Sequence, residues 1–329
     1  METVRIPGTD LDVSRIALGT WAIGGWMWGG TDESAAIDTI YAALDRGVNV
    51  IDTAPVYGFG TSETIVGKAL KGRGNRDRVV LATKAGLEWK NGNVFRNSDP
   101  SRIAFEVEDS LQRLQTDYID IYFIHWPDPR VPCEETAQIM EALQQQGKIR
   151  AVGVSNYTPE QMEVFRRIGE IHVCQPPYNI FERGIETDLV PYCRDNNIAL
   201  MTYGALCRGL LSGKMSHNRE FEGDDLRQID PKFQDPRFGR YLKAAERLAQ
   251  LARDHAGKPL LPAAVRWILD QGIDIAIWGG RRPDQMDPID AVFGWEVDEG
   301  FKSAVDDILN ETLPDPVGPE FMAPPPRET

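Results

Sequence analysis

Residues 118–156 read YIDIYFIHWPDPRVPCEETAQIMEALQQQGKIRAVGVSN. The apolar run 118–124 predicts a buried strand, and residues 133–146 have the spacing of an amphipathic helix that ends at Gly147. A second apolar run, 149–154, predicts another strand. Strands that are apolar along their whole length are typical of a parallel sheet covered on both faces. This stretch therefore predicts a parallel strand–helix–strand unit.

The same alternation extends over most of the chain. We predict eight strands, at residues 15–19, 48–52, 78–83, 118–124, 149–154, 171–175, 198–203 and 273–278. Helices are expected at 33–46, 62–70 (with Ser62 as N-cap), 101–114, 133–146, 159–168, 186–196, 239–256 and 260–271. Eight such units in 329 residues favour an α/β fold with a single (β/α)8 TIM barrel over residues 1–329. An open, doubly wound sheet is the alternative.

Two segments depart from the alternation. Residues 204–238 lack periodicity, so we expect a long insertion loop at the C-terminal face of the barrel, either a lid or a disordered segment. Residues 313–329 are rich in proline and are expected to form an extended tail without helix. This tail is either solvated or packed through Phe321 and Met322.

The composition limits the classes of partner. A net charge of −14 and a pI of about 4.8 argue against a protein that binds nucleic acid. We find no signal-peptide pattern and no segment near the roughly 20 apolar residues of a membrane span. The four cysteines show no metal-ligand or redox-pair spacing. We therefore expect a cytoplasmic protein with reduced thiols that binds neither membrane nor nucleic acid.

Residues that are mostly polar lie at the points where the predicted strands end. They are Gly19, Thr20, Trp21, Asp52, Lys84, His125, Ser155, Asn156, Gln175, Tyr203, Gly279, Gly280, Arg281 and Arg282. In a parallel barrel these ends converge on one face, which holds the active site. Taken singly, Asp52 could be a turn residue, Lys84 a surface lysine and His125 a core histidine. Together with Tyr57, they form a candidate site.

The chemistry of carbonyl reduction fits this set. A hydride that reaches a carbonyl carbon leaves an alkoxide, which needs a proton from a positioned acid. We expect Tyr57 to be that acid, with its pKa lowered by the Lys84 ammonium and with Asp52 orienting the lysine. A neutral His125 would hydrogen-bond the carbonyl oxygen. The four histidines are too scattered to suggest a metal site.

Two glycine-rich segments do not match nucleotide-binding motifs. Residues 58–63 follow a strand like a dinucleotide fingerprint, but Glu63 stands where the third glycine belongs. Residues 209–215 are one residue short of a P-loop and lack the final serine or threonine. A better anion site is expected from Lys214, Arg227, Arg281 and Arg282, which follow strands seven and eight, where barrels often bind phosphate.

Several segments together resemble the aldo-keto reductase superfamily over essentially the whole chain. They are residues 18–21 (LGTW), 52–58 (DTAPVYG), 83–84 (TK), 124–126 (IHW), 147–156 (GKIRAVGVSN) and 175–179 (QPPYN). Residues 278–285 (WGGRRPDQ) and 315–324 (DPVGPEFMAP) are similar to the bacterial branch that includes general-stress proteins. Two positions depart from the wider family: Trp278 replaces a proline, and Ile289 replaces an asparagine often placed against adenine.

The resemblance implies an NADP-binding barrel whose catalytic tetrad is Asp52, Tyr57, Lys84 and His125. It implies that Ser155, Asn156 and Gln175 hold the nicotinamide amide and that the ring stacks on Tyr203. Residues 203–214 would then bind the pyrophosphate, with Gly204, Leu206, Arg208, Gly209 and Leu210 along the loop. The phosphates and the adenosine end would contact Lys214, Arg227, Gly280, Arg281, Arg282 and Gln285. We expect Gly19, Thr20, Trp21, Asp52 and Gly279 to border the same cofactor.

The predicted function is reduction of an aldehyde or ketone to an alcohol by an NADP(H)-dependent oxidoreductase. The paired arginines favour NADP(H) over NAD(H), since a 2′-phosphate prefers a guanidinium. The expected substrate pocket contains Trp21, Trp28, Tyr57, Trp89, His125 and Trp126; these tryptophans, with Trp26 and Phe59, could instead only pack loops onto the barrel. The partner is then a small carbonyl or alcohol, and the sequence leaves the oligomeric state open. The alternatives are a redox-sensing barrel that holds NADPH with slow turnover, and a hydrolase or lyase that uses Asp52 and His125.

Overall fold

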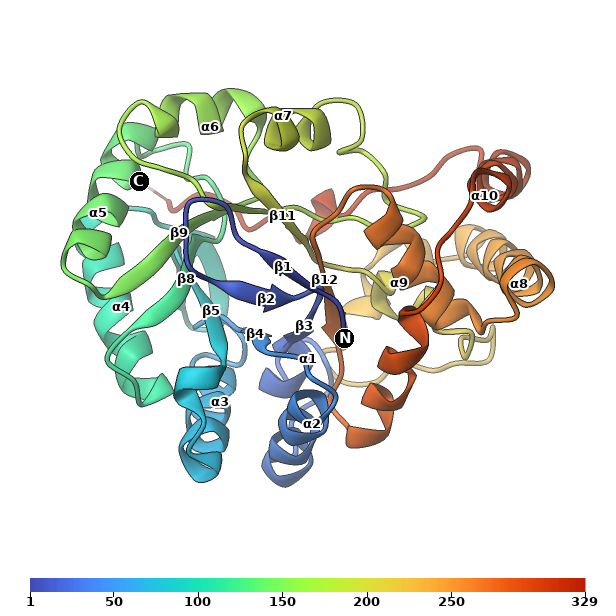
Figure 1. Ribbon diagram of the computed structural model, residues 1–329, viewed down its shortest axis with the longest axis horizontal. Coiled ribbons are helices and arrows are strands. Elements are labelled where there is room, and N and C mark those ends of the chain that lie inside the picture. Colours follow the sequence, from blue (N-terminus) through green and yellow to red (C-terminus); the bar gives the residue numbers. More distant parts are fainter. Residues whose placement is uncertain (329) are drawn as a thin grey trace.

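Short apolar runs form eight parallel strands that close into a barrel in the computed structural model, which describes residues 1–328 (Figure 1). The strands are β3 (Ile16–Gly19), β4 (Val50–Asp52), β5 (Val80–Ala85), β8 (Ile119–Ile124), β9 (Ile149–Ser155), β10 (Val173–Gln175), β11 (Ala199–Thr202) and β12 (Ile275–Gly279). Each strand pairs in parallel with its neighbour along the chain, and β12 closes the barrel against β3. The prediction of a (β/α)8 barrel is confirmed.

Both faces of these strands are buried, which explains their continuous apolar sequences. In β4, Val50 belongs to a core cluster inside the barrel, whereas Ile51 belongs to the cluster between the strands and the surrounding helices. Ile121 and Tyr122 of β8 divide in the same way. Because side chains alternate along a strand, most positions must suit one of two apolar environments. Asp120 of β8 and Arg150 of β9 are exceptions near the starts of their strands, where they pair with each other at 2.5 Å.

Helices surround the barrel at the predicted places. They are α2 (Glu33–Asp45), α3 (Thr61–Arg73), α4 (Pro100–Leu114), α5 (Cys133–Gln145), α6 (Pro159–Arg166), α7 (Leu189–Asp195), α8 (Arg237–Ala256) and α9 (Leu260–Asp270). Short elements that were not predicted are α1 (Trp21–Gly24) and the 3-10 turns η1 (Arg76–Arg78) and η5 (Pro283–Val292). Within residues 1–328, no helix combines the length and hydropathy needed to span a bilayer.

The prediction that Ser62 caps its helix is wrong. Gly60 is the N-cap of α3, and Ser62 lies inside the first turn with its side chain fully buried. Its hydroxyl donates to Thr20 Oγ1 at 2.7 Å, so Ser62 ties the helix to the end of β3.

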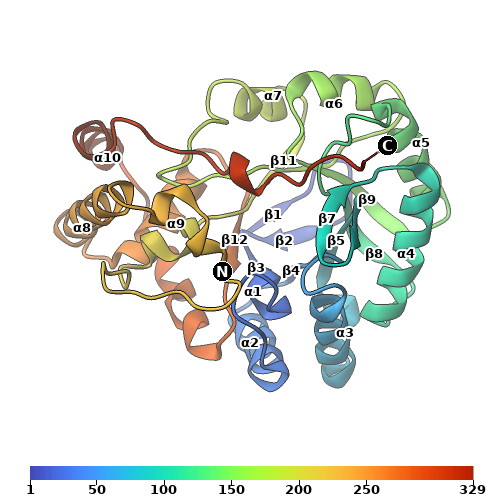
Figure 2. The same cartoon turned by 180° about the vertical axis from the view of Figure 1, so that it is seen from behind.

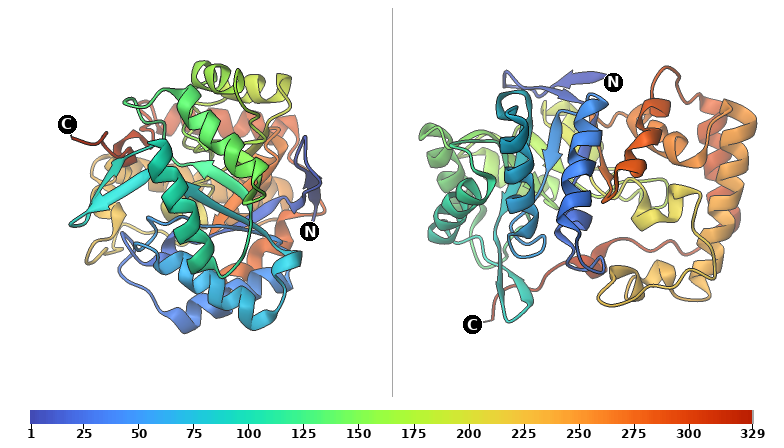
Figure 3. Two further views of the ribbon diagram at one scale, coloured as in Figure 1. Left: turned by 90° about the vertical axis from the view of Figure 1, so that its left-hand side faces the viewer. Right: turned by 90° about the horizontal axis from the view of Figure 1, so that it is seen from below.

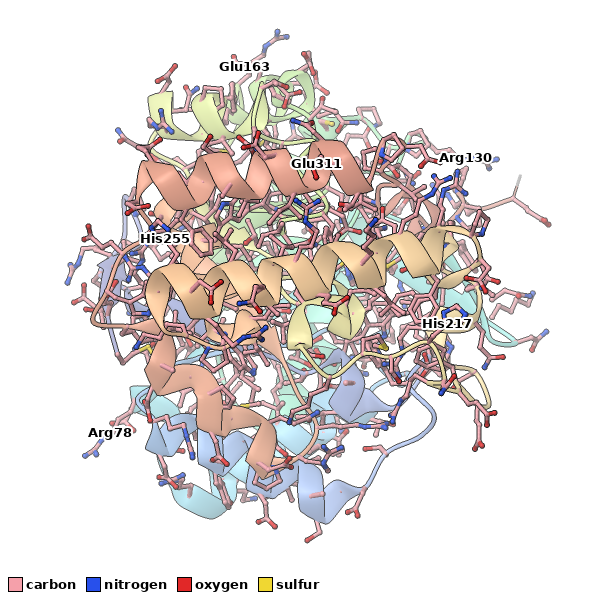
Figure 4. All side chains as sticks on the ribbon, turned by 90° about the vertical axis from the view of Figure 1, so that its right-hand side faces the viewer. Arg78, Arg130, Glu163, His217, His255 and Glu311 are labelled. Atoms are coloured by element: carbon pink, nitrogen blue, oxygen red, sulfur yellow. The ribbon has the colours of Figure 1, made fainter. Side chains whose placement is uncertain are left out.

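A further helix, α10 (Glu299–Thr312), was also not predicted. It runs beside α8 on one flank of the barrel, with Glu311 on α10 and His255 near the end of α8 (Figure 4). Arg247 of α8 pairs with Glu311 at 2.5 Å, and His255 meets Asp298, the N-cap of α10, at 2.9 Å.

The end of the barrel where the strands begin is covered by an N-terminal hairpin. Strands β1 (Thr3–Arg5) and β2 (Asp12–Ser14) form it, and they cross the opening in Figures 1 and 3. The Ser14 amide donates to Asn49 Oδ1 at 2.7 Å, next to the start of β4. The apolar side chains of the hairpin segment, Ile6, Leu11 and Val13, join the core inside the barrel. The active site must therefore open at the other end.

That other end, the mouth, is bordered by a second hairpin, the insertion and the tail. The hairpin pairs β6 (Leu87–Lys90) with β7 (Asn93–Arg96). The insertion is not one featureless loop, since it contains the 3-10 turns η2 (Cys207–Ser212), η3 (Leu226–Gln228) and η4 (Pro231–Phe233). The tail crosses the mouth from α10 to the hairpin (Figure 2), where the Pro325 carbonyl accepts from the Arg96 amide at 2.8 Å. It is extended except for one 3-10 turn, η6 (Glu320–Met322), so the expectation of a tail without helix is wrong there.

Candidate active site

Three neighbouring strands deliver the predicted catalytic residues to the mouth. Asp52 ends β4, Lys84 is the penultimate residue of β5, and His125 directly follows β8. Tyr57 lies on the turn that leads from β4 into α3. The four residues predicted as a tetrad thus meet at one end of the barrel, as their positions in the sequence suggested.

The centre of the site is a buried ion pair. Lys84 Nζ donates to both carboxylate oxygens of Asp52, at 2.7 and 2.9 Å, and to the carbonyl of Thr53 at 2.9 Å. Gln175 Nε2 donates to Asp52 Oδ1 at 2.8 Å. All of these side chains are almost fully buried. Burial lowers the pKa of Lys84, and the neighbouring Asp52 carboxylate opposes that change.

Aromatic contacts of its ring fix the position of the Tyr57 side chain. The ring stacks on Trp21 with centroids 5.8 Å apart, and it meets the edge of His125 at 5.8 Å. The Lys84 ammonium lies 5.0 Å from the ring centroid. Burial raises the pKa of Tyr57 well above its ordinary value, and the negative charge of Asp52 raises it further. The expectation that Lys84 lowers this pKa is therefore wrong: the Asp52 carboxylate offsets the ammonium, and desolvation dominates.

His125 lies at the same wall of the site. Burial lowers its pKa well below the ordinary value, and the positive charge of Lys84 lowers it further. The imidazole is therefore neutral at physiological pH, as predicted, and can act as a hydrogen-bond donor without carrying a charge.

A group of polar side chains lies on the next arc of the mouth, on or directly after the strands β9, β10 and β11 that follow β8. Asn156 Nδ2 donates to the His125 carbonyl at 3.0 Å, and its Oδ1 accepts from the Tyr203 hydroxyl at 2.8 Å. Ser155 donates to the Gln175 carbonyl at 2.7 Å. Asn156 has a φ of 62°, a left-handed conformation that asparagine tolerates and that aims its amide along the rim. Ser155, Asn156, Gln175 and Tyr203 are thus brought together as the sequence predicted.

The loop after β11, residues 203–214, is the segment that the resemblance predicts to bind the pyrophosphate, and for that prediction we call it the cofactor loop. Gly204 and Gly209 have positive φ values of 77° and 97°, Leu206 is half-buried and Leu210 is fully buried. The Arg208 side chain is not directed at the mouth. Its guanidinium is buried and pairs with Glu182 at 2.6 Å and with Asp230. Only the backbone of Arg208 remains for a ligand.

The predicted phosphate-binding cations form two groups. Arg227 pairs with Asp225 at 2.5 Å and lies 5.3 Å from the Trp28 ring, while Arg281 donates to the Trp28 carbonyl at 2.6 Å. Lys214 and Arg282 form the second group. The hydrogen bond that Arg282 donates to Asp284, at 3.1 Å, lowers the pKa of that carboxyl, and the positive charges of Arg282 and Lys214 lower it further. The Gln285 side-chain oxygen accepts the amides of residues 281 and 282, so it shapes the turn that carries the arginines.

At the strand ends, Thr20 and two of the three glycines are packed tightly against other parts of the barrel. Thr20 is fully buried, and its amide and hydroxyl both donate to the Asp52 carbonyl, at 3.0 and 2.9 Å. A Cβ on Gly19 would lie 2.6 Å from Ile277, and one on Gly280 would lie 2.4 Å from Met286. Gly279 faces open space. Thr20 therefore supports Asp52 from behind, whereas Gly279 is accessible.

Aromatic side chains line the mouth beside Tyr57. Trp21 and Trp28 meet edge to face with centroids 5.9 Å apart, and Phe59 contacts both Trp26 at 5.2 Å and Trp89 at 5.4 Å. Trp89 lies on β6 and Trp21 begins α1, so neither of these two tryptophans is on a loop. Trp126 is covered by the Arg96 guanidinium at 5.1 Å. Among the described residues, the indole nitrogens of Trp21 and Trp28 are buried without a hydrogen-bond partner.

Residues that the sequence did not reveal complete the site. Thr53 enters through its carbonyl, which no side-chain pattern can signal. Asp224 accepts the amides of Met27 and Gly29, at 2.7 and 3.1 Å, and so joins the insertion to the loop after β3. Glu182 lies just after the segment 175–179 (QPPYN), and no motif in the sequence marks it as part of the site. Residues 1–328 contain no group of three or more histidine, cysteine, aspartate or glutamate side chains placed to hold a metal ion.

Comparison with known proteins agrees with this geometry. The model of the Aldo/keto reductase family matches residues 15–310. The chain is 57% identical over 329 residues to aldo-keto reductase YhdN of Bacillus subtilis, covering 100% of this chain and 99% of that protein. It is 39% identical over 303 residues to the NADH-specific methylglyoxal reductase of Escherichia coli, covering 87% and 91% of the two chains.

A solved structure shows the same fold over nearly the whole chain. The glycerol dehydrogenase AKR11B4 from Gluconobacter oxydans has a TM-score of 0.88 and 53% identity, with 98% of this chain and 99% of that chain covered. The protein is thus an oxidoreductase of a class that uses nicotinamide cofactors. The chain belongs to the aldo/keto reductase family.

Proposed function

We propose that this protein is an NADP(H)-dependent reductase of aldehydes and ketones, with Tyr57 as the proton donor and the whole chain acting as one barrel domain. The observation that carries the proposal is the buried Lys84–Asp52 pair directly beside the Tyr57 ring, with His125 at its edge. Buried charged groups are costly, so a fully paired cluster at the mouth of a barrel indicates a function.

The residues at the mouth fit a nicotinamide dinucleotide. Amide groups from Asn156 and Gln175 suit a carboxamide, and the partly exposed Tyr203 ring offers a flat face beside them. Cations from the insertion and from the turn after β12 suit phosphates. The two sets come from β9–β11 and from the segments after β11 and β12, on one continuous rim. A bound nicotinamide would supply the hydride for the reaction.

The proton then comes from the chain itself. The raised pKa keeps Tyr57 protonated at neutral pH, so the donor is always present in its active form. As a substrate oxygen gains negative charge, the nearby Lys84 ammonium and the neutral His125 stabilise that charge and the phenolate that follows. Asp52 and Gln175 keep Lys84 in place, because their contacts fix its otherwise flexible side chain.

We propose that NADP(H) is preferred over NAD(H), because Arg281 and Arg282 follow β12 side by side and can meet a 2′-phosphate. The relative from Escherichia coli, at 39% identity, is NADH-specific, so membership of the family does not by itself determine whether NADP(H) or NAD(H) is preferred. Both cofactors must be compared directly.

The substrate is proposed to be a small carbonyl compound that enters between Trp21, Trp28, Trp89 and Trp126. Similar proteins are named for methylglyoxal and for glycerol. Methylglyoxal as oxidant and glycerol as reductant therefore belong in any substrate panel, beside simple aldehydes.

In the first step of the test, the purified protein is titrated with NADPH and, separately, with NADH, and binding is monitored by tryptophan fluorescence. Oxidation of NADPH is then measured on the substrate panel. Tight NADPH binding with turnover supports the proposal. Binding with negligible turnover on every carbonyl would favour a redox-sensing barrel, and absence of binding would reject a nicotinamide enzyme.

A further inference from the structure

A group of four charged side chains lies buried beside the cofactor loop and takes no part in the proposed chemistry. Its members are Glu182, Arg208, Asp230 and Lys232, which we call the buried quartet. Lys232 and Asp230 are fully buried, and Glu182 and Arg208 are no more than 8% exposed. Two carboxylates face two cations, so the quartet is neutral as a whole.

Each charge in the quartet is paired. Glu182 Oε1 accepts from Arg208 at 2.6 Å and from Lys232 at 2.8 Å. Asp230 accepts from Arg208 Nε, and its other oxygen accepts the Lys232 amide at 2.9 Å. Replacing such a network with apolar residues is often neutral or stabilising, so stability alone is a weak explanation for keeping it.

The quartet holds the cofactor loop at two points. Arg208 is itself part of the loop. The second carboxylate oxygen of Glu182 accepts from Asn179 Nδ2 at 2.6 Å, and the same nitrogen donates to the Gly204 carbonyl at 3.0 Å. Both the first turn of the loop and its middle therefore depend on Glu182.

The backbone at Arg208 is strained. Cys207 and Arg208 have φ values of 44° and 52°, and Gly209 follows with 97°. Two consecutive residues with a Cβ in the left-handed region are unfavourable unless their surroundings enforce it, and such conformations gather at ligand-binding sites. Here the enforcement comes from the guanidinium of Arg208, which is fixed on two carboxylates.

The quartet also reaches the C-terminal tail. Lys232 Nζ donates to the Gly318 carbonyl at 3.0 Å, and the Arg208 guanidinium lies 5.6 Å from the Phe321 ring. In Figure 2 this tail crosses the mouth on its way to the β6–β7 hairpin. The quartet therefore joins the loop, the insertion and the tail.

We propose that Glu182, Asp230 and Lys232 are positioning residues that hold Arg208, and with it the turn 207–209, in the backbone conformation that binds the phosphates of the nicotinamide dinucleotide. This inference rests on the proposed function, and it gives Arg208, which the resemblance places along the pyrophosphate loop, a role through its backbone, because its side chain is bound to Glu182 and Asp230. The quartet acts on cofactor affinity and does not touch the reacting atoms.

The test uses Lys232, because it lies outside the cofactor loop and its ammonium joins Glu182 of the quartet, at 2.8 Å, to the Gly318 carbonyl of the tail, at 3.0 Å. Lys232→Met removes one cation and leaves two carboxylates facing Arg208 alone. Lys232→Gln removes the charge but keeps a donor, and it serves as a milder variant where Lys232→Met does not fold. Lys71→Met, at an exposed position on α3, is the matched control.

The expected result is a split between binding and turnover. The Kd for NADPH should rise about tenfold in Lys232→Met and about threefold in Lys232→Gln. The kcat at saturating NADPH and the KM for the carbonyl substrate should stay within about twofold, since the tetrad is untouched. Lys71→Met should match the wild type in all three.

A purely structural role would lower the midpoint of thermal unfolding without changing Kd at a temperature where the variant is folded. Folded Lys232 variants that bind NADPH like the wild type would overturn the inference while leaving the reductase intact. A wild-type protein that binds neither NADPH nor NADH would instead overturn the proposed function itself.

Discussion

Replacing Tyr57 with phenylalanine tests the proposed proton donor most directly. The substitution removes one hydroxyl and keeps the ring that stacks on Trp21 and meets His125. The hydrogen bonds at the centre of the site run from Lys84 to Asp52 and from Gln175 to Asp52, and they do not include the Tyr57 hydroxyl. We therefore expect the free energy of unfolding to change by about 0.5 kcal/mol or less.

Turnover should respond far more strongly. A positioned acid contributes about 100-fold to 10,000-fold to a rate, which corresponds to a barrier of about 3 to 5 kcal/mol. We expect kcat to fall by that factor, and we expect the Kd for NADPH to stay within about twofold because the ring remains. Tyr41→Phe, which removes the phenol hydroxyl on α2 that donates to the Ala69 carbonyl, is the control.

The assay follows the absorbance of NADPH with a saturating aldehyde, over a range of pH. Because the pKa of Tyr57 lies well above its ordinary value and that of His125 well below, neither group should titrate between about pH 7 and pH 9. Wild-type kcat/KM for NADPH, which reports the groups of the free enzyme, should therefore be nearly constant in that interval. A Tyr57→Phe variant that keeps more than about a tenth of the wild-type kcat would refute the donor role.

Three further predictions concern charge. Lys84→Met leaves the Asp52 carboxylate buried without its cation, so it should lower the free energy of unfolding by about 3 to 5 kcal/mol in urea titrations and abolish turnover; an unchanged midpoint would contradict this. Arg281→Ala should weaken NADPH binding about tenfold more than NADH binding, whereas equal losses would reject a 2′-phosphate contact. Burial raises the pKa of Glu106 from 4.5 to about 7, so the folded state keeps a proton that the unfolded state loses, and stability falls by up to about 3 kcal/mol as pH rises between these values. Glu106→Gln should show a smaller fall than wild type when unfolding is compared at about pH 5 and about pH 8, and an equal fall would show that Glu106 is not the cause.

The barrel and the tetrad could be predicted because local sequence determines them. The strands are buried on both faces along most of their length, so a mainly apolar run such as 119–124, which Asp120 alone interrupts, is visible without knowledge of its neighbours. The polar residue that follows an apolar run marks the C-terminal end of a strand, and in a parallel barrel all of these strand ends lie on one face. Asp52, Lys84 and His125 could therefore be grouped although they are far apart in the chain.

The hairpins and the path of the tail could not be predicted, because distant residues stabilise them. The β6–β7 hairpin is joined to the tail by bonds from Arg96 to the carbonyls of Pro324 and Pro325, across more than 200 residues of sequence. The N-terminal hairpin depends in the same way on Asn49 and on the Arg150–Asp10 pair at 2.8 Å. Neither segment has a local pattern strong enough to predict a strand.

The pKa of Tyr57 shows a second limit of sequence reasoning. The residues near the tyrosine were predicted correctly, yet the predicted direction of the shift was wrong. An ammonium near a phenol lowers its pKa only if its charge is not offset, and here Lys84 Nζ lies within 2.9 Å of both Asp52 oxygens. The pair acts on Tyr57 mainly as a dipole, so desolvation decides the direction. A bound nicotinamide would change this balance through its own charge, so the acidity of Tyr57 is a property of the complex rather than of the tetrad alone.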